Sequence, residues 1–370
     1  MVEYQEWAGA DPDCAGRLDD VPFMPAGEEP AREPVRFKSV AEFLAEYVPL
    51  SYAVEPIVRS GSLYTLTART GAGKTALFIV MALAIASGRS DLLGVEAEPG
   101  RVALLTFENP DDVRMRMLIA AFALNIDLRD IAGNLEVLDK RARPEDITAQ
   151  LDAMSQSRPF RLILVDTLAA FFDGDNINDA VQGGNFMRRM RPMTRLPELP
   201  AVLVAAHPVK NAAEDNLLPY GSGAILNEVD GNLMLWRKAE TGASVLHWQG
   251  KLRGLEFNPI AYKVEVTGCP AVLDTKDRQV QLPYFVPIKE GVAEMEARAK
   301  ADSDTGLALL RAMMAHPTGT QRDWAAAIDR VLSNVSARLP RLAREKLVEC
   351  INGKWRVTPK GIKEVERWSP

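Results

Sequence analysis

The residues with the clearest chemical capability form one glycine-rich loop. Residues 68–75 read Ala-Arg-Thr-Gly-Ala-Gly-Lys-Thr, after the apolar run Leu63–Ala68 and before the helix-forming run at 76–86. Glycines let backbone N–H groups turn around phosphate oxygens, and the N-terminus of a following helix adds positive potential. The Lys74 ammonium would reach the β- and γ-phosphates, and the Thr75 hydroxyl would ligate Mg²⁺.

This pattern is a P-loop in which Ala68 takes the place of the usual first glycine. That position lies furthest from the phosphates, so we interpret the alanine as a tolerated variant. The alternative is a glycine-rich turn that precedes a helix by chance, but a strand before and a helix after argue against it. The sequence therefore predicts ATP binding by residues Arg69, Thr70, Gly71, Ala72, Gly73, Lys74, Thr75 and Ala76.

A second acidic position is needed to complete the metal site. The run Arg161-Leu-Ile-Leu-Val-Asp166 ends a strand with a carboxylate and resembles a Walker B strand, so Asp166 and Thr75 are expected to hold Mg²⁺. The alternative is an aspartate that only caps the next helix. Because the next residue is Thr167 and not a glutamate, the catalytic base must come from elsewhere.

Two further strand ends offer polar side chains. Glu108 ends the run VALLTFE, where a carboxylate could orient and deprotonate the attacking water. The alternative is a surface glutamate that caps the next helix. A base on this second strand favours a RecA-like ATPase over an AAA+ one. His207 ends the run AVLVAAH, at the edge where open α/β sheets bind ligands, and could sense the γ-phosphate. The alternative is a strand-end histidine in ordinary hydrogen bonds.

Composition limits the other classes of function. The 370 residues are 47% hydrophobic and 25% charged, which is typical of a globular chain with one large and one small domain. A membrane or secretory protein is not expected, because there is no run of 18 apolar residues and no basic-then-apolar start. A disulfide framework or structural zinc site is not expected either, and we predict a cytoplasmic location, because the cysteines are widely separated. They are Cys14, Cys269 and Cys350.

The net charge of −6 is divided unevenly along the chain. Residues 1–35 carry 9 acidic and 2 basic residues, whereas residues 301–370 carry 12 basic and 8 acidic residues. The C-terminal segment is therefore at +4 and the remainder at −10. This division favours a polyanionic partner for the C-terminal segment.

Four segments are expected, and the largest has an α/β fold. We expect an acidic disordered arm at 1–36, a P-loop ATPase domain at 37–286, a linker at 287–304 and a separate domain at 305–370. An amphipathic helix is expected within 39–48. Short apolar strands separated by helices indicate a mostly parallel sheet covered on both faces. They are Leu63–Ala68, Arg101–Phe107, Leu135–Leu138, Leu162–Val165 and Ala201–Ala206. Consecutive strands after Val229 indicate an antiparallel extension, at 231–237, 244–253 and 261–267.

The motifs together resemble a known family over roughly residues 38–270. Their order is the P-loop, TFENP, RLILVDTLAAFF, DGDNINDA, AHPVK, GSGAI and GKLRG. This series resembles the RepA-like branch of the hexameric RecA-like ATPases, relatives of the replicative DnaB-type helicases. The resemblance implies that Glu108 is the catalytic glutamate and His207 the phosphate sensor.

The resemblance also assigns two residues to a subunit interface. Lys251 and Arg253, in QGKLRG, match bases that reach the neighbouring subunit's nucleotide, where cations neutralise transition-state charge. The alternative is two solvated bases on one strand face, since residues i and i+2 point the same way.

In the same family, the segment at 208–226 would face a central channel for single-stranded DNA. Lys210 is its only base, and the segment also carries the acidic Glu214 and Asp215, so we expect only weak electrostatic binding to DNA. A basic cluster lies nearby in the sequence, although a solvated helix face explains it equally well. It consists of Arg188, Arg189, Arg191 and Arg195.

From Thr305 onward the pattern becomes helical. Three helical runs precede Asn352-Gly353, a two-residue hairpin signal, and the order resembles a winged helix. Pro340 departs from that pattern, because it removes a hydrogen bond from the third helix and is expected to kink or shorten it. Contact with duplex DNA and docking on a protein are both open. The expected DNA contacts are Arg338, Arg341, Arg344, Lys354 and Arg356.

The leading prediction is a Mg²⁺-dependent ATPase in a ring, six-membered by the resemblance, that acts in DNA replication or a related DNA transaction. A second hypothesis is an ATP-switched DNA-binding regulator or initiation factor that does not separate strands. A third is a loading partner that docks on replication proteins through residues 305–370. Strand displacement distinguishes the first hypothesis from the others.

Overall fold

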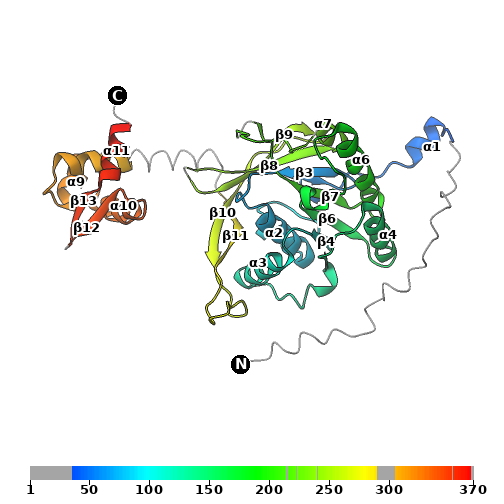
Figure 1. Ribbon diagram of the computed structural model, residues 1–370, viewed down its shortest axis with the longest axis horizontal. Helices are drawn as coiled ribbons and strands as arrows, with labels where there is room; N and C mark the ends of the chain where they lie inside the picture. The colour runs from blue at the N-terminus through cyan, green and yellow to red at the C-terminus, as the bar shows by residue number, and fades with distance from the viewer. Residues whose placement is uncertain are drawn as a thin grey trace. The chain divides into compact units, whose positions relative to one another are not determined.

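The structure, a computed structural model, describes residues 36–213, 216–221, 223–239, 241–289, 305–351 and 353–367 (Figure 1). The chain divides into two units, Met1–Pro49 and Leu50–Pro370. In the first unit, helix α1 (Val40–Ala45) begins at the N-cap Ser39, whose side chain and that of Glu42 form a reciprocal capping box. Residues 36–50 are all exposed. The helix expected within 39–48 is therefore present, and almost all of the acidic arm lies outside the described residues.

The second unit is built on a nine-stranded sheet. Its order is β11-β10-β9-β8-β3-β7-β6-β4-β5. Strands β8, β3, β7, β6, β4 and β5 run parallel to one another. These six are Gly231–Arg237 (β8), Leu63–Thr67 (β3), Ala201–Ala206 (β7), Phe160–Asp166 (β6), Arg101–Thr106 (β4) and Leu135–Leu138 (β5). The five sequence-predicted strands are confirmed, and the mostly parallel α/β fold with them.

Helices cover both faces of the parallel strands, which is why these strands are apolar on both sides (Figure 1). Along β6, Leu162 and Leu164 pack in the core that contains α2 and α3, whereas Ile163 and Val165 pack in the core that contains α4, α6 and α7. The helices and short 3₁₀ turns are α2 (Lys74–Ser87), η4 (Ser90–Leu92), α3 (Pro110–Ala123), η5 (Ala132–Asn134), α4 (Pro144–Ser155), α5 (Leu168–Phe171), α6 (Ala180–Met190), η6 (Arg191–Arg195) and α7 (Gly223–Glu228).

An antiparallel extension continues the sheet beyond β8. The first of its three predicted strands, 231–237, is β8 itself, and it runs parallel to β3 and antiparallel only to β9, so the extension begins one strand later than expected. The extension consists of β9 (Ser244–Leu252), β10 (Ile260–Thr267) and β11 (Leu282–Pro287). The sequence did not predict β11, although this strand packs on α2 and α3. The sequence also did not predict the small hairpin of β1 (Tyr52–Val54) and β2 (Val58–Arg59). Strand β11 ends at Pro287, the first residue of the expected linker, and residues 290–304 lie outside the described part.

The C-terminal residues form a small core of their own. Residues 305–315 are helical. They are followed by α9 (Gln321–Ala327), α10 (Leu332–Arg344), the hairpin of β12 (Val348–Ile351) and β13 (Lys354–Val357), and α11 (Pro359–Arg367). Helix α10 continues through Pro340, and Val335, Leu339 and Leu342 bury its apolar face. The proline was expected to kink or shorten the helix, and the helix is not shortened, because it runs four residues past Pro340. At the hairpin turn, Gly353 adopts φ +76°, and Asn352 lies outside the described residues.

In the part of the chain that the structure describes, no helix is both long and apolar enough to cross a membrane.

Candidate functional site

The P-loop wraps around an open space at the carboxyl ends of the parallel strands. Gly71 and Gly73 adopt φ +80° and +102°, a left-handed conformation that favours glycine, and helix α2 begins directly afterwards at Lys74. The Ser244 hydroxyl on β9 donates a hydrogen bond of 3.0 Å to the Ala72 carbonyl. The loop is thus fixed both by its glycines and by the antiparallel extension.

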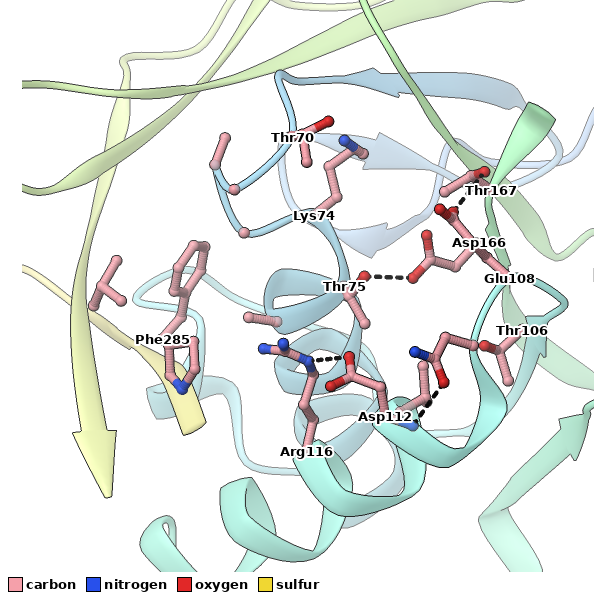
Figure 2. Close-up of a pocket in the computed structure, with 18 of the residues that line it drawn as sticks. Thr70, Lys74, Thr75, Thr106, Glu108, Asp112, Arg116, Asp166, Thr167 and Phe285 are labelled. Atoms are coloured by element: carbon pink, nitrogen blue, oxygen red, sulfur yellow. Dashed lines mark hydrogen bonds and ion pairs between the residues drawn. The ribbon is translucent and has the colours of Figure 1, made fainter. Parts of the chain in front are cut away.

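A cavity of about 430 Å³ lies against this loop, and Figure 2 shows its lining. Nearly all the predicted nucleotide and catalytic residues line it. They are Thr70, Gly71, Ala72, Gly73, Lys74, Thr75, Ala76, Glu108, Asp166 and His207. The tertiary structure therefore brings together strand ends that lie more than a hundred residues apart, because the carboxyl ends of parallel strands share one edge of the sheet.

Lys74 is the buried cation of the site. Its ammonium donates a hydrogen bond of 2.8 Å to the Ala68 carbonyl, and the residue is only 7% exposed. Burial lowers the pKa of Lys74, and the negative charges of Asp166 and Glu108 oppose that shift. A buried ammonium that is held by carbonyl oxygens is well placed to meet an anionic ligand.

The Thr75 hydroxyl donates a hydrogen bond of 2.7 Å to the Asp166 carboxylate. Asp166 is 4% exposed, and burial raises its pKa, whereas the Thr75 hydrogen bond and the Lys74 charge lower it. A hydroxyl and a carboxylate are hard oxygen ligands that suit Mg²⁺. The described residues contain no group of three or more His, Cys, Asp or Glu that could hold a metal ion. These two oxygens therefore fit Mg²⁺ only with phosphate oxygens and water as its further ligands.

Glu108 and His207 also line the cavity. The Thr167 hydroxyl donates a hydrogen bond of 3.3 Å to Glu108, which fixes the carboxylate beside Asp166. His207 follows β7 directly. Burial lowers the pKa of His207, and repulsion from the Lys74 charge lowers it further. Its imidazole is therefore neutral at pH 7 and can donate or accept a hydrogen bond.

The structure adds residues that the sequence analysis missed. Asn109, Asp112 and Arg116 follow Glu108 at helical spacing and line the cavity, so their spacing was a usable signal. Arg237 ends β8 at the same edge of the sheet. Phe285 lies across the loop, and a Cβ added to Gly73 would stand 2.3 Å from its ring. No local pattern reveals this last contact, which joins residues 212 positions apart.

Arg69 differs from the rest of the loop, because it lines a smaller adjoining cavity of about 170 Å³ and not the main one. Its guanidinium lies 4.9 Å from the ring centre of Trp236 and donates a hydrogen bond to the Ala212 carbonyl. Arg69 therefore connects the P-loop to the segment after His207.

Lys251 and Arg253 lie at the opposite edge of the sheet. Leu252, which lies between them, pairs with Gly231 at the start of β8, and Gly231 pairs with Tyr64 near the start of β3. The P-loop follows the other end of β3, so the two bases and the P-loop lie at opposite ends of these strands. Neither base lines the main cavity. Lys251 donates hydrogen bonds to the carbonyls of Leu226 and Asn227. Arg253 forms an ion pair of 3.0 Å with the buried Asp230.

The segment after His207 folds back on itself. The backbone N–H of Tyr220 donates to the His207 carbonyl at 2.6 Å, and the Tyr220 hydroxyl accepts from Asn178 at 2.9 Å. Lys210 is exposed. Glu214, Asp215 and Ser222 lie outside the described residues. The nearby basic cluster is largely engaged in structural ion pairs: Arg188 with Glu228, Arg189 with Glu145 and Asp173, and Arg191 with Asp230.

The basic residues of the C-terminal region divide into two groups. Arg341, Arg344, Lys354 and Arg356 are exposed. Arg338 is partly buried, and its guanidinium packs against the helical Gly306. Arg356 also lies opposite Glu349 in the β12–β13 pairing, which partly balances its charge.

One comparison with known proteins gives a match. Residues 30–213, about half of the chain, match the model of a family described as the AAA domain. No curated protein matches the chain. The match covers the P-loop, Glu108, Asp166 and His207. Together with the α/β fold, it identifies this stretch as a P-loop ATPase domain, which binds and hydrolyses a nucleotide.

Proposed function

We propose that the chain is a Mg²⁺-dependent, RecA-like ATPase of the RepA-like branch that assembles into a six-membered ring and acts in DNA replication or a related DNA transaction. One observation carries the hydrolytic part: Lys74, the Thr75–Asp166 pair and Glu108 line one cavity. The RecA-like assignment is supported by the carboxylate at the end of β4, while the residue after Asp166 is a threonine.

Each residue has a defined task in this mechanism. The Lys74 ammonium binds the β- and γ-phosphate oxygens and balances charge that develops there. Thr75 and Asp166 would hold Mg²⁺, which supplies further charge neutralisation when bound. The Glu108 carboxylate, oriented by Thr167, accepts a proton from the attacking water. Neutral His207 contacts the γ-phosphate, and its backbone carbonyl, bonded to Tyr220, relays the contact to the segment at 208–221.

The need for an assembly rests on Lys251 and Arg253. Both are anchored, by carbonyls and by Asp230, at the edge of the sheet opposite their own P-loop. Burial lowers the pKa of Lys251, and the nearby Arg253 charge lowers it further, whereas Asp230 and Glu228 oppose that shift. Bases at this edge meet a nucleotide only when that nucleotide belongs to a neighbouring subunit.

A subunit-mixing experiment tests this arrangement. Lys74→Ala removes the ammonium that binds the phosphates in the same subunit, and Arg253→Ala removes the cation that acts on the neighbouring subunit's nucleotide. Each variant alone should therefore lose about 10³-fold or more in hydrolysis rate. Arg253→Ala should still bind ATP. Mixed in equal amounts, the two should regain about a quarter of the wild-type rate, because some interfaces then pair an intact P-loop with an intact Arg253.

Lys263→Ala serves as the control, since Lys263 is an exposed base on β10 that pairs with Glu265. Its hydrolysis rate should equal that of the wild type. Mixtures that stay inactive, or Arg253→Ala protein that loses ATP binding, would count against the trans-acting role.

A second candidate function is an ATP-switched DNA-binding regulator. This function is favoured by the low positive charge of the segment at 208–226, in which Lys210 is the only described base. Most arginines of the nearby cluster form ion pairs within the chain and are not available to DNA. Stimulation of hydrolysis by single-stranded DNA supports the ring motor. A rate that is indifferent to single strands, with duplex binding intact, supports the regulator.

A further inference from the structure

A buried carboxylate holds two arginines at the end of the sheet where Arg253 lies. Asp230 directly precedes β8, and its side chain is only 9% exposed. Its Oδ1 accepts a hydrogen bond of 3.0 Å from Arg253, and its Oδ2 accepts one of 2.9 Å from Arg191. Oδ2 also accepts a hydrogen bond of 2.9 Å from the backbone N–H of Leu63. One negative charge therefore faces two cations and a backbone donor.

The two arginines are held to different degrees. Arg191 follows α6 as its C-cap residue, its side chain is 31% exposed, and its guanidinium also donates to the Glu228 carbonyl. The Arg253 side chain is 66% exposed, and its Nη1 makes the contact with Asp230. Arg191 is thus the more firmly fixed partner of the carboxylate, and Arg253 is the partner with room to move.

A buried carboxylate whose charge is balanced by one cation can release a second cation at low cost. Breaking a buried ion pair is costly mainly because it leaves a charge without a partner. When Arg253 leaves Asp230, the guanidinium of Arg191 and the N–H of Leu63 still bind the carboxylate. Without Arg191, Arg253 would be the one described cation hydrogen-bonded to Asp230, and its release would leave a buried charge unbalanced.

We propose that Arg191 is a positioning residue for Arg253. It balances the charge of Asp230, so that the Arg253 guanidinium can leave the carboxylate and reach the neighbouring subunit's nucleotide. Arg191 does not itself touch that nucleotide, and it acts only in the subunit that supplies Arg253. This inference rests on the proposed trans-acting role of Arg253 and adds the residue that keeps Arg253 available for it.

The carboxylate and its two arginines are separate from the phosphate-binding groups of the same subunit. The carboxylate bonds to the start of β3, whereas the P-loop follows the end of that strand. Besides burial, the groups that shift the pKa values of Lys74 and Asp166 all line the cavity, and Arg191 is not among them. A substitution at Arg191 should therefore leave the subunit's own phosphate-binding groups unperturbed.

The subunit-mixing experiment isolates this role, because only the Lys74→Ala subunit supplies Arg253 in it. Arg191→Gln is added to that subunit, which is then mixed in equal amounts with Arg253→Ala protein. The hydrolysis rate should fall by about 5- to 20-fold, because Asp230 then retains Arg253. Adding Asp230→Asn to the same subunit should restore most of the rate, since the amide oxygen still accepts the Leu63 hydrogen bond but carries no charge.

Arg188→Gln in the Lys74→Ala subunit is the matched control, because Arg188 also belongs to α6 but pairs with Glu228. That mixture should keep the rate of the parent mixture of Lys74→Ala and Arg253→Ala proteins. A rate that Arg191→Gln leaves unchanged would overturn the positioning role.

The variant that combines Arg191→Gln with Asp230→Asn tests the proposal even if Arg191→Gln alone fails to fold, which circular dichroism detects. A rate near that of the parent mixture is expected, because no buried charge then needs a cation. A rate that stays low in folded protein would show that Arg191 does more than balance Asp230, and would overturn the proposal. A parent mixture without activity would instead overturn the trans-acting role of Arg253, which separates the two failures.

Discussion

Asp166 carries a charge that the folded structure disfavours. Burial raises its pKa above the ordinary value of 3.8, and only the Thr75 hydrogen bond and the charges of Lys74 and Arg116 oppose that shift. The folded chain therefore holds this proton more tightly than the unfolded chain does. Through this group, stability falls as the pH rises from about 4 through the folded pKa, and the deficit remains at pH 7.

Asp166→Asn should therefore stabilise the protein without nucleotide while abolishing Mg²⁺-dependent hydrolysis. The amide oxygen can still accept the Thr75 hydrogen bond, but the buried charge is gone, so we expect a gain of about 0.5–2 kcal/mol in the free energy of unfolding at pH 7. Denaturant titration at pH 7 and hydrolysis assays measure the two effects. Lower stability at pH 7 would show that the Lys74 attraction outweighs the cost of burial.

At the scale of elements, the P-loop depends on a contact with a distant strand. Gly71 and Gly73 both adopt left-handed backbone conformations, yet their surroundings differ. A Cβ on Gly71 would meet nothing within 4 Å, whereas a Cβ on Gly73 would overlap the Phe285 ring of β11. The antiparallel extension therefore limits which residue the loop can hold at position 73.

This difference gives a matched pair of substitutions. Gly71→Ala should cost about 1–2 kcal/mol of unfolding free energy, from backbone strain alone. Gly73→Ala should cost clearly more and should also reduce ATP affinity, because the loop or Phe285 must move. Denaturant titration and ATP binding check both. Equal losses in the two variants would mean that β11 does not restrain the loop.

At the scale of the whole molecule, the charge division separates the acidic majority of the chain from a basic C-terminal segment. The described part of that segment has its own core, and its exposed bases lie on α10 and on the β12–β13 hairpin. We expect these exposed bases, and not the partly buried Arg338, to set the affinity for duplex DNA.

Replacing Arg344, Lys354 and Arg356 together with alanine should weaken duplex binding. The slope of log affinity against log salt should shrink by about 2 to 3, since each lost phosphate contact removes about 0.9. Basal ATP hydrolysis should not change. Titrations at several salt concentrations measure the slope, with Lys263→Ala as the control. An unchanged slope would favour docking on a protein through this segment.

The amino-acid sequence alone determined the P-loop, the strand-end residues Asp166, Glu108 and His207, and the parallel strands. Each of these is a local signal: a glycine spacing, an apolar run, or a polar residue at the end of a run. The parallel direction of these strands then follows a general rule, because apolar strands separated by helices form parallel sheets.

Only the tertiary structure decided what surrounds those residues. Phe285 against Gly73 and the hydrogen bond from Ser244 to Ala72 join segments that are remote in the chain. Side chains from β10 and β11 reach the loop because β9 to β11 extend the sheet past β8. Such contacts depend on strand register and on packing between layers, and a local pattern carries no record of either.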